Sequence, residues 1–583
     1  MQDSKVWAIE DIFSSIDDWQ TEYQSVQKEI DFEEFKDKLG EKQGFLACMK
    51  KQESVGRRIE KLGVYAMMLH DGDTRDSLFD SLSSKMGPLY TAYGTKTAFI
   101  GPTLTALPEQ TLKSYINDPE LSEYDYFLKG VLKEKAHTLT ENEETLLAMT
   151  GEMAGSFKDV FTKIDNADLP LNPFKYKGKK VEMTHAGYGV AMHSQDRNFR
   201  KAYFKNYYKA YEDLLNSITA TYFGSVKKDV FYARARKYDS SLDRALKGED
   251  VSKKVYDNLI KSVNKALPLL HRYMRDKKKL LGLKTMHMYD IYASGVEDAE
   301  IKLPFDKAYE LVVEGLSVLG EEYRDLLIKA KTDRWIDVYE RPGKRSGAYS
   351  VAVYNTHPFV LLNYKETTNN VFTIAHEMGH SIHSYFSNKT QPYAKADYKI
   401  FVAEVASTVN EVLLIKYLLK KETDKKVKKF LLSYLLEMIR TTLFRQTQFS
   451  EFEEFAHSTY ENGEPLTKDL LNAKYFEINK KYYGRSIKYD DEIKYEWARI
   501  PHFYRAFYVY KYATGIISAL TIADRILLEG KPAIDDYFKF LSSGGSDGPV
   551  ELLKIAGVDL TTKKPFESAF NSFKDALIQF ESL

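Results

Sequence analysis

The chain has 583 residues, of which 43% are hydrophobic and 29% charged, so it can bury a large core and is neither a disordered nor a fibrous protein. Its 84 basic residues balance its 84 acidic residues, which excludes a global field that would recruit nucleic acid or an anionic membrane. Cys48 is the only cysteine in the sequence, so disulfide frameworks and multi-cysteine metal sites are excluded. A bound metal would need His, Asp or Glu ligands.

The sequence contains few helix-breaking residues, 31 Gly and 16 Pro, which favours a mostly helical protein. Residues 166–180, with several Pro and Gly, are typical of a connector, and we place a boundary near residue 190. Residues 1–190 are then expected to form an N-terminal helical lobe, and residues 191–583 the region that carries the chemistry. Apolar residues recur with helical spacing in three regions before residue 335, at 9–113, 121–163 and 196–330.

A different pattern follows at residues 335–364. A turn-rich loop at 341–347 precedes two short β-like runs, 348–354 and 359–364, which predict a small hairpin or the edge of a small sheet. Helical patterns then resume and continue to the end of the sequence. The expected fold class is therefore mainly α, with one small β element next to the site described below.

The pentapeptide H-E-x-x-H follows this β element. On a helix, His376 and His380 lie one turn apart on one face and can share a metal ion, while Glu377 lies beside them and can take a proton from a metal-bound water. Gly379 leaves room for the backbone of another segment to approach. The alternative interpretation is a pair of surface histidines with a neighbouring glutamate.

Zinc requires a third protein ligand and an open position for water. His383 shares the helical stripe but lies about 10.5 Å along the axis from His376, too far for both to bind one ion comfortably. Glu404 is the better candidate, because a carboxylate in an otherwise apolar run is costly unless a cation offsets it. Glu411, two turns further on the same face, is expected to orient a ligand imidazole. The alternative for Glu404 is a helix-face glutamate that bonds to a neighbour.

A second group of polar aromatic residues lies at 500–512. A histidine, His502, and several tyrosines on one expected helix offer neutral donors for a tetrahedral oxyanion. Spacing leaves open which residues point inward, since 504, 508 and 512 form one stripe and 503, 507 and 510 another. An aromatic-rich helix of this kind is also typical of a protein core.

These residues resemble the oligoendopeptidase F branch of the thimet-oligopeptidase-like zinc metallopeptidases. The resemblance implies a two-lobed helical clamshell with a deep substrate channel. It also implies one Zn²⁺ per chain, held by His376, His380 and Glu404, with Glu377 as general base for a zinc-activated water. Six blocks in family order carry it, at residues 343–350, 358–364, 376–380, 403–408, 501–515 and 544–547.

The resemblance further implies hydrolysis of internal peptide bonds in short, unstructured oligopeptides. His502, Tyr504 and Tyr510 are the residues we expect to contact the reaction intermediate. An extended peptide is expected to lie beside the second β-like run and gain strand-type hydrogen bonds from it. The substrate-binding residues expected from this arrangement are Phe359, Val360, Leu361, Leu362 and Tyr508.

Three alternatives lead to other functions. A zinc aminopeptidase usually carries a Gly-x-Met-Glu-Asn segment, which this sequence lacks. A carboxypeptidase built on a similar helical body, and a helical peptide-binding scaffold with incidental histidines, both stay open. Residues 1–7 contain no apolar run of signal-peptide length, and the longest apolar stretch, 515–523, is about half of the roughly 20 residues that span a bilayer. We therefore expect a cytoplasmic protein with no membrane or nucleic-acid partner.

Overall fold

The structure, a computed structural model, describes residues 5–296 and 299–583 and is 73% helical with only a few short strands. The expected mainly α fold class is confirmed. The chain divides into two compact units, each built from three separate segments. Unit 1 comprises residues 1–138, 301–418 and 522–558, and unit 2 comprises residues 139–300, 419–521 and 559–583. The boundary near residue 190 stays a prediction.

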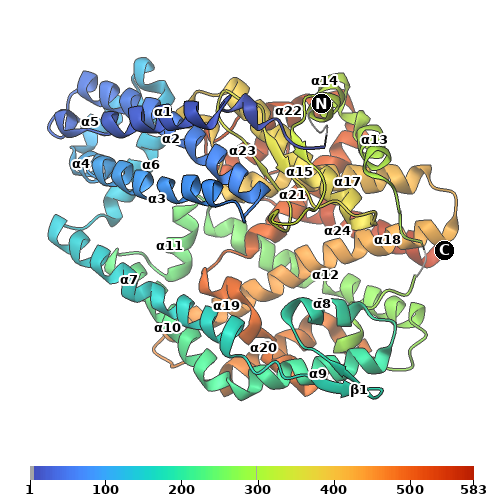
Figure 1. The fold of residues 1–583 in the computed structure, drawn as a ribbon. Coiled ribbons are helices and arrows are strands. Elements are labelled where there is room, and N and C mark those ends of the chain that lie inside the picture. Colours follow the sequence, from blue (N-terminus) through green and yellow to red (C-terminus); the bar gives the residue numbers. More distant parts are fainter. Residues whose placement is uncertain (1–4, 297–298) are drawn as a thin grey trace. The chain divides into compact units, whose positions relative to one another are not determined.

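Unit 1 contains the N-terminal helices and helix α15, which carries the H-E-x-x-H motif (Figure 1). Its helices are α1 (Ile16–Glu29), α2 (Lys42–Gly72), α3 (Ser77–Thr97), α4 (Ile100–Ala106), α5 (Glu109–Ile116), α6 (Asp125–Glu134), α13 (Phe305–Gly315), α14 (Glu321–Thr332), α15 (Thr368–Thr390), α16 (Tyr393–Ala396), α17 (Ile400–Lys421), α22 (Lys531–Leu541) and α23 (Pro549–Ile555). The last residues of α17 are assigned to unit 2.

Unit 2 is also mainly helical. Its helices are α7 (Glu141–Lys163), α8 (His185–His193), α9 (Arg197–Asp213), α10 (Leu215–Ala235), α11 (Ser241–Gly248), α12 (Lys253–Leu280), α18 (Lys425–Ile439), α19 (Arg445–Glu461), α20 (Lys468–Tyr483) and α24 (Lys564–Ser582). Helix α21 (Tyr510–Glu529) contributes residues to both units. Among the described residues, every helix is too short or too polar to cross a bilayer.

The small β element next to the motif is a three-stranded sheet in the order β4-β6-β5. Strand β6 (Phe359–Leu361) lies in the centre, parallel to β4 (Ile336–Asp337) and antiparallel to β5 (Tyr349–Val351). Phe359 and Leu361 are fully buried and join the apolar core that α1–α6 form. The sheet thereby connects the N-terminal helices of unit 1 to the segment that carries the motif.

One small β element was expected, whereas the described residues contain three small sheets. Two further pairs of short strands lie in unit 2, an antiparallel hairpin of β1 (Phe174–Tyr176) with β2 (Lys179–Val181) and a parallel pair of β3 (Met286–His287) with β7 (Ile487–Lys488). The β3–β7 pair joins residues about 200 positions apart in the chain. A two-residue strand has too few positions for an alternating pattern, so sequence periodicity carries no signal for it.

Candidate metal centre

Helix α15 presents the two histidines of the motif. Its N-terminus is capped by Thr367, whose hydroxyl accepts a hydrogen bond from the amide of Asn370 at 3.3 Å. His376 and His380 then lie one turn apart, and their Nε2 atoms are 3.2 Å from each other. Both imidazoles are half-buried, so the pair is accessible from one side of the helix.

Glu404 of α17 lies opposite these two imidazoles. One of its carboxylate oxygens is 3.4 Å from Nε2 of His376 and 3.6 Å from Nε2 of His380. Ligand atoms of the three residues all lie within 4.8 Å of one another, and among the described residues this is the one group of His, Cys, Asp or Glu with such geometry. The sequence-based donor set is therefore brought together by the fold.

Glu411 completes the arrangement behind His376. Its carboxylate pairs with Nδ1 of His376, on the opposite side of the ring from Glu404. Burial alone would lower the pKa of His376, but the hydrogen bonds to Glu404 and Glu411 raise it well above its ordinary value. Two carboxylates therefore place negative potential on a pair of imidazoles, which is the electrostatic setting that a divalent cation requires.

The donors converge because α15 and α17 pass each other in close contact (Figure 1). A Cβ atom at Gly379 would lie 2.5 Å from the Cα of Ser407 and 2.7 Å from the carbonyl oxygen of Ala406. Only a glycine fits at that distance, since real Cβ atoms are never so close to another backbone. The expectation that Gly379 admits another segment is thus confirmed.

Glu377 lies next to the donors and has a different environment from the other carboxylates. It is 7% exposed, and burial raises its pKa while His376 and His380 act in the opposite direction. The helix is fixed at this point by Ser381, whose hydroxyl donates to the carbonyl of Glu377 at 2.9 Å and lies 2.8 Å from the hydroxyl of Ser350 on β5. Burial thus makes the protonated form of this carboxyl group less unfavourable than it is in water.

His383 has a packing role. It is fully buried, its ring stacks on Tyr398 with 3.8 Å between ring centroids, and burial lowers its pKa to about 3. It lies outside the donor group, as expected from its distance along the helix.

The strand expected to bind a peptide lies in the centre of the small sheet rather than at its edge. Residues Phe359, Val360 and Leu361 form the central strand β6, whose backbone is paired on both sides, and Leu362 also donates its amide to Asp337. A strand whose two edges are occupied cannot pair with a peptide, so these four residues were wrongly chosen. Strand β5 pairs on one edge only among the described residues.

The segment at 500–512 is not one helix, which corrects the sequence-based expectation. A short 3₁₀ helix, Pro501–Tyr504, is followed by a turn, and α21 begins at Tyr510. Phe507 has a φ of 53°, a left-handed conformation, and its amide donates to the buried Glu453 at 3.1 Å. This tertiary hydrogen bond stabilises a break that helical spacing does not reveal.

The break determines which side chains of the segment are exposed. Tyr504 and Tyr510 are 5% and 1% exposed, and the hydroxyl of Tyr504 lies 2.7 Å from that of Thr221 in unit 2. His502 is exposed, and its ring stacks on the half-buried Tyr508. These residues belong to unit 2 and the metal donors to unit 1, so their contacts with the reaction intermediate stay predictions.

Two residues of the site were missed by the sequence analysis. Asn410 is fully buried on α17, where its side-chain amide donates to the carbonyl of Ala375 at 3.0 Å and its oxygen accepts from the hydroxyl of Tyr323 at 2.8 Å. A signal for Asn410 exists, because it is a polar residue within the same apolar run as Glu404. Tyr323 of α14 gives no such signal, since its contact is distant in sequence.

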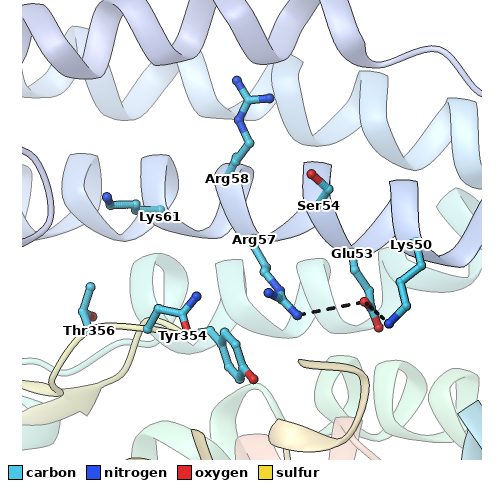
Figure 2. A pocket seen from close by; sticks show the side chains of 9 residues that line it. Lys50, Glu53, Ser54, Arg57, Arg58, Lys61, Tyr354 and Thr356 are labelled. Carbon is cyan, nitrogen blue, oxygen red and sulfur yellow. Dashed lines mark ion pairs between the residues drawn. The ribbon is translucent and has the colours of Figure 1, made fainter. Parts of the chain in front are cut away.

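A separate pocket of about 540 Å³ lies in unit 1 between α2 and the loop after β5 (Figure 2). Its one carboxylate, Glu53, lies 3.6 Å from the ammonium of Lys50 and 4.0 Å from the guanidinium of Arg57. Arg57 also packs on the ring of Tyr354. No group of metal donors among the described residues lies there, so this pocket is distinct from the candidate centre.

The donor group fits a divalent transition metal. Two imidazole nitrogens and one carboxylate oxygen are the ligand set of a catalytic zinc site, which leaves a fourth position for water or substrate. In His376, pairing of Nδ1 with Glu411 leaves Nε2 for the metal, which is the second contact that metal-binding histidines usually have.

Comparisons with known proteins show the family to which this chain belongs. A family model described as Peptidase family M3 matches residues 190–572, and one described as Oligopeptidase F matches residues 104–170. Oligopeptidase PepF of Bacillus subtilis is 43% identical over 99% of this chain and 87% of its own length. Group B oligopeptidase PepB of Streptococcus agalactiae is 38% identical over 99% and 96%. The solved oligoendopeptidase-F of Enterococcus faecium is 33% identical, with a TM-score of 0.74 and coverage of 97% and 98%.

The fold and the donor group together define a helical metallopeptidase. More specifically, the chain belongs to the oligoendopeptidase F branch of peptidase family M3.

Proposed function

We propose that this peptidase is a zinc-dependent endopeptidase that hydrolyses internal bonds of short, unstructured oligopeptides. The observation that carries the proposal is the convergence of His376, His380 and Glu404 within 4.8 Å, with Glu377 beside them. These three residues would hold one Zn²⁺ per chain. When bound, zinc supplies Lewis-acid polarisation of the scissile carbonyl and lowers the pKa of water.

The proton transfers are assigned to Glu377. As a carboxylate it accepts the proton of the attacking water, and as the acid it delivers that proton to the leaving nitrogen. The raised pKa that burial gives Glu377 supports this exchange, because the protonated form is less unfavourable than it would be in water. His502 and the half-buried Tyr508 are proposed to donate hydrogen bonds to the intermediate, whereas the same role for the buried Tyr504 and Tyr510 stays an expectation from the sequence.

Strand β5 is the proposed docking edge for the peptide. One of its edges is paired with β6, and Ser350 in its middle is hydrogen-bonded to Ser381, one residue after His380. A peptide that pairs with the other edge of β5 would run past α15 in an extended conformation, with backbone hydrogen bonds that do not depend on side-chain identity. This arrangement replaces the expected pairing with β6.

The proposal is tested with internally quenched peptides that are blocked at both ends. An endopeptidase cuts them, whereas an aminopeptidase or a carboxypeptidase does not. A chelator should abolish cleavage and added zinc should restore it, and Glu404→Gln should lose bound zinc. Glu366→Gln, which changes an exposed carboxylate just before α15, is the matched control and should retain both zinc and activity.

A protein that cuts blocked peptides equally well in a chelator, or a Glu404→Gln variant with full zinc content, contradicts the proposal. The expected cytoplasmic location and the expected absence of nucleic-acid and membrane partners stay predictions.

A further inference from the structure

Four contacts follow one another where α15 and α17 pass each other in antiparallel directions. From residue 404 to residue 411 of α17, the contacted residues of α15 run backwards from 380 to 375 and 376, as expected for antiparallel helices. The contacts are Glu404 with His380, Ser407 with Gly379, Asn410 with Ala375, and Glu411 with His376. The two carboxylates that contact the histidines, Glu404 and Glu411, thus lie at the two ends of this ladder of contacts, and neither middle contact involves a candidate metal ligand.

The position of both carboxylates depends on the register of this ladder. A slip of one residue along α17 turns the helix by about 100° and moves it by about 1.5 Å, which would take Glu404 and Glu411 away from the imidazoles together. Apolar contacts of α17, such as those of the buried Val405 and Val409, are non-directional and specify the register only weakly.

Asn410 makes the directional contact of the ladder that involves neither the two carboxylates nor the two histidines. Its amide donates to the carbonyl of Ala375, the residue directly before His376, and its oxygen accepts from the Tyr323 hydroxyl. All the polar atoms of this fully buried side chain point to fixed partners, so a change of register would leave a buried amide without its hydrogen bonds. A buried polar residue of this kind is the best-attested device for fixing the register of packed helices.

We infer that Asn410, held by Tyr323, is a positioning residue that fixes the register of α17 on α15 and thereby sets Glu404 and Glu411 against the two histidines. The inference rests on the proposed function, because it assigns Asn410 a role in assembling the zinc site. It adds a third helix, α14, to the elements on which the metal centre depends.

The test measures zinc affinity by competition with a chelator, together with the unfolding midpoint of the metal-free protein. Asn410→Leu removes both hydrogen bonds at similar volume and should weaken zinc binding by roughly 10-fold or more, as observed for residues that support metal ligands. Tyr323→Phe removes one hydroxyl only and should weaken zinc binding by about threefold, which keeps the test decisive if Asn410→Leu does not fold.

Two variants control for a general effect of buried polar groups. Asn479→Leu removes a buried asparagine of α20 whose amide donates to the carbonyl of Tyr475 at 2.9 Å. Tyr309→Phe removes a buried hydroxyl that donates to the carbonyl of Leu327 at 2.7 Å. Both should lower the unfolding midpoint and leave zinc affinity at the wild-type value.

Wild-type zinc affinity in both Tyr323→Phe and Asn410→Leu would overturn the inference, as would an equal loss of affinity in the two control variants. A Glu404→Gln variant run in parallel separates this failure from failure of the proposed function. If Glu404→Gln loses zinc and the Asn410 and Tyr323 variants do not, only the register inference is wrong. If Glu404→Gln also keeps zinc, the metal site itself is misassigned.

Discussion

Glu411 pairs with Nδ1 of His376, and this pairing leaves Nε2 as the nitrogen that faces Glu404 at 3.4 Å. The two nitrogens of an imidazole are distinct, and the hydrogen bond made by one decides which of them can bind a metal. Glu411 would therefore act on a bound metal through the ring of His376, without being a ligand itself. Glu404 and Glu411 lie seven residues apart on the same face of α17, so one helix carries both carboxylates.

Replacement of Glu411 by Gln should lower zinc affinity by about 10–100-fold while Glu404 remains in place. The amide removes the negative charge that raises the basicity of His376 and can present a donor where an acceptor is needed. Chelator competition measures the effect, with Glu366→Gln as the control. Zinc affinity equal to wild type would mean that Glu411 does not orient the ring.

Gly379→Ala should force α15 and α17 apart, because the new methyl group would lie 2.5 Å from the Cα of Ser407. We expect the free energy of unfolding to fall by about 1–3 kcal/mol and the zinc content to fall with it. The matched control is Gly94→Ala in α3, where a Cβ meets nothing within 4 Å. That variant should gain about 0.5–1 kcal/mol from the better helix propensity of Ala, as measured by urea unfolding. Equal effects of the two variants would contradict the close helix contact.

Tyr504→Phe should act on stability, because the Tyr504 hydroxyl lies in the interior of unit 2 against that of Thr221. We expect a loss of about 1 kcal/mol in the free energy of unfolding and a kcat near the wild-type value. Tyr508→Phe changes a half-buried ring beside His502, and it should lower kcat while it leaves the free energy of unfolding near the wild-type value. A large fall in kcat for Tyr504→Phe at unchanged stability would support the contact with the reaction intermediate that is expected from the sequence.

Protonation of Glu496 should lower the free energy of unfolding in acid. It is 2% exposed and accepts hydrogen bonds from Arg445 at 2.8 Å and from the Tyr475 hydroxyl at 2.6 Å. Burial raises its pKa, but the charges of Arg445 and Arg499 outweigh this effect and lower the pKa to about 2. Because the folded-state pKa lies below the ordinary 4.5, the carboxylate contributes stability that is fully present above about pH 4.5 and is lost as the pH falls toward 2.

The measurement is the free energy of unfolding of wild type and Glu496→Gln as a function of pH. The difference should be about 3 kcal/mol at pH 7 and should shrink as the pH falls below 4.5. Glu477→Gln in the same unit, which changes an exposed glutamate paired with Lys474, should differ little from wild type at any pH. A difference that does not change with pH would mean that the ion pair does not cause the stabilisation.

The metal donors could be predicted from the sequence because they depend on local geometry. His376 and His380 share a face whenever the segment is helical, and Glu404 is conspicuous because an unpaired carboxylate is costly in an apolar run. The small sheet before the motif was also predicted, since β-like runs and turn residues are local signals. Its strand order was not, because β4 lies beside β6 only through a connection that periodicity does not encode.

The segment that carries His502 shows the opposite case. Its aromatic spacing is compatible with a helix, but the left-handed Phe507 and its hydrogen bond to Glu453, 54 residues earlier, interrupt the segment, and α21 begins only at Tyr510. Asn410 was missed for a related reason. Its identity is visible in the sequence, whereas its two partners on α15 and α14 follow from tertiary packing alone.

The discontinuity of unit 1 has a consequence for synthesis on the ribosome. The core of the N-terminal helices is completed only after residue 361 has been added, since Val353, Phe359 and Leu361 belong to that core. At about 5–20 residues per second, the part of this core that Val353, Phe359 and Leu361 cover stays open for on the order of 10–45 s after residue 138 has been added. Holding chaperones that bind exposed apolar chains would have their greatest effect on yield during that interval.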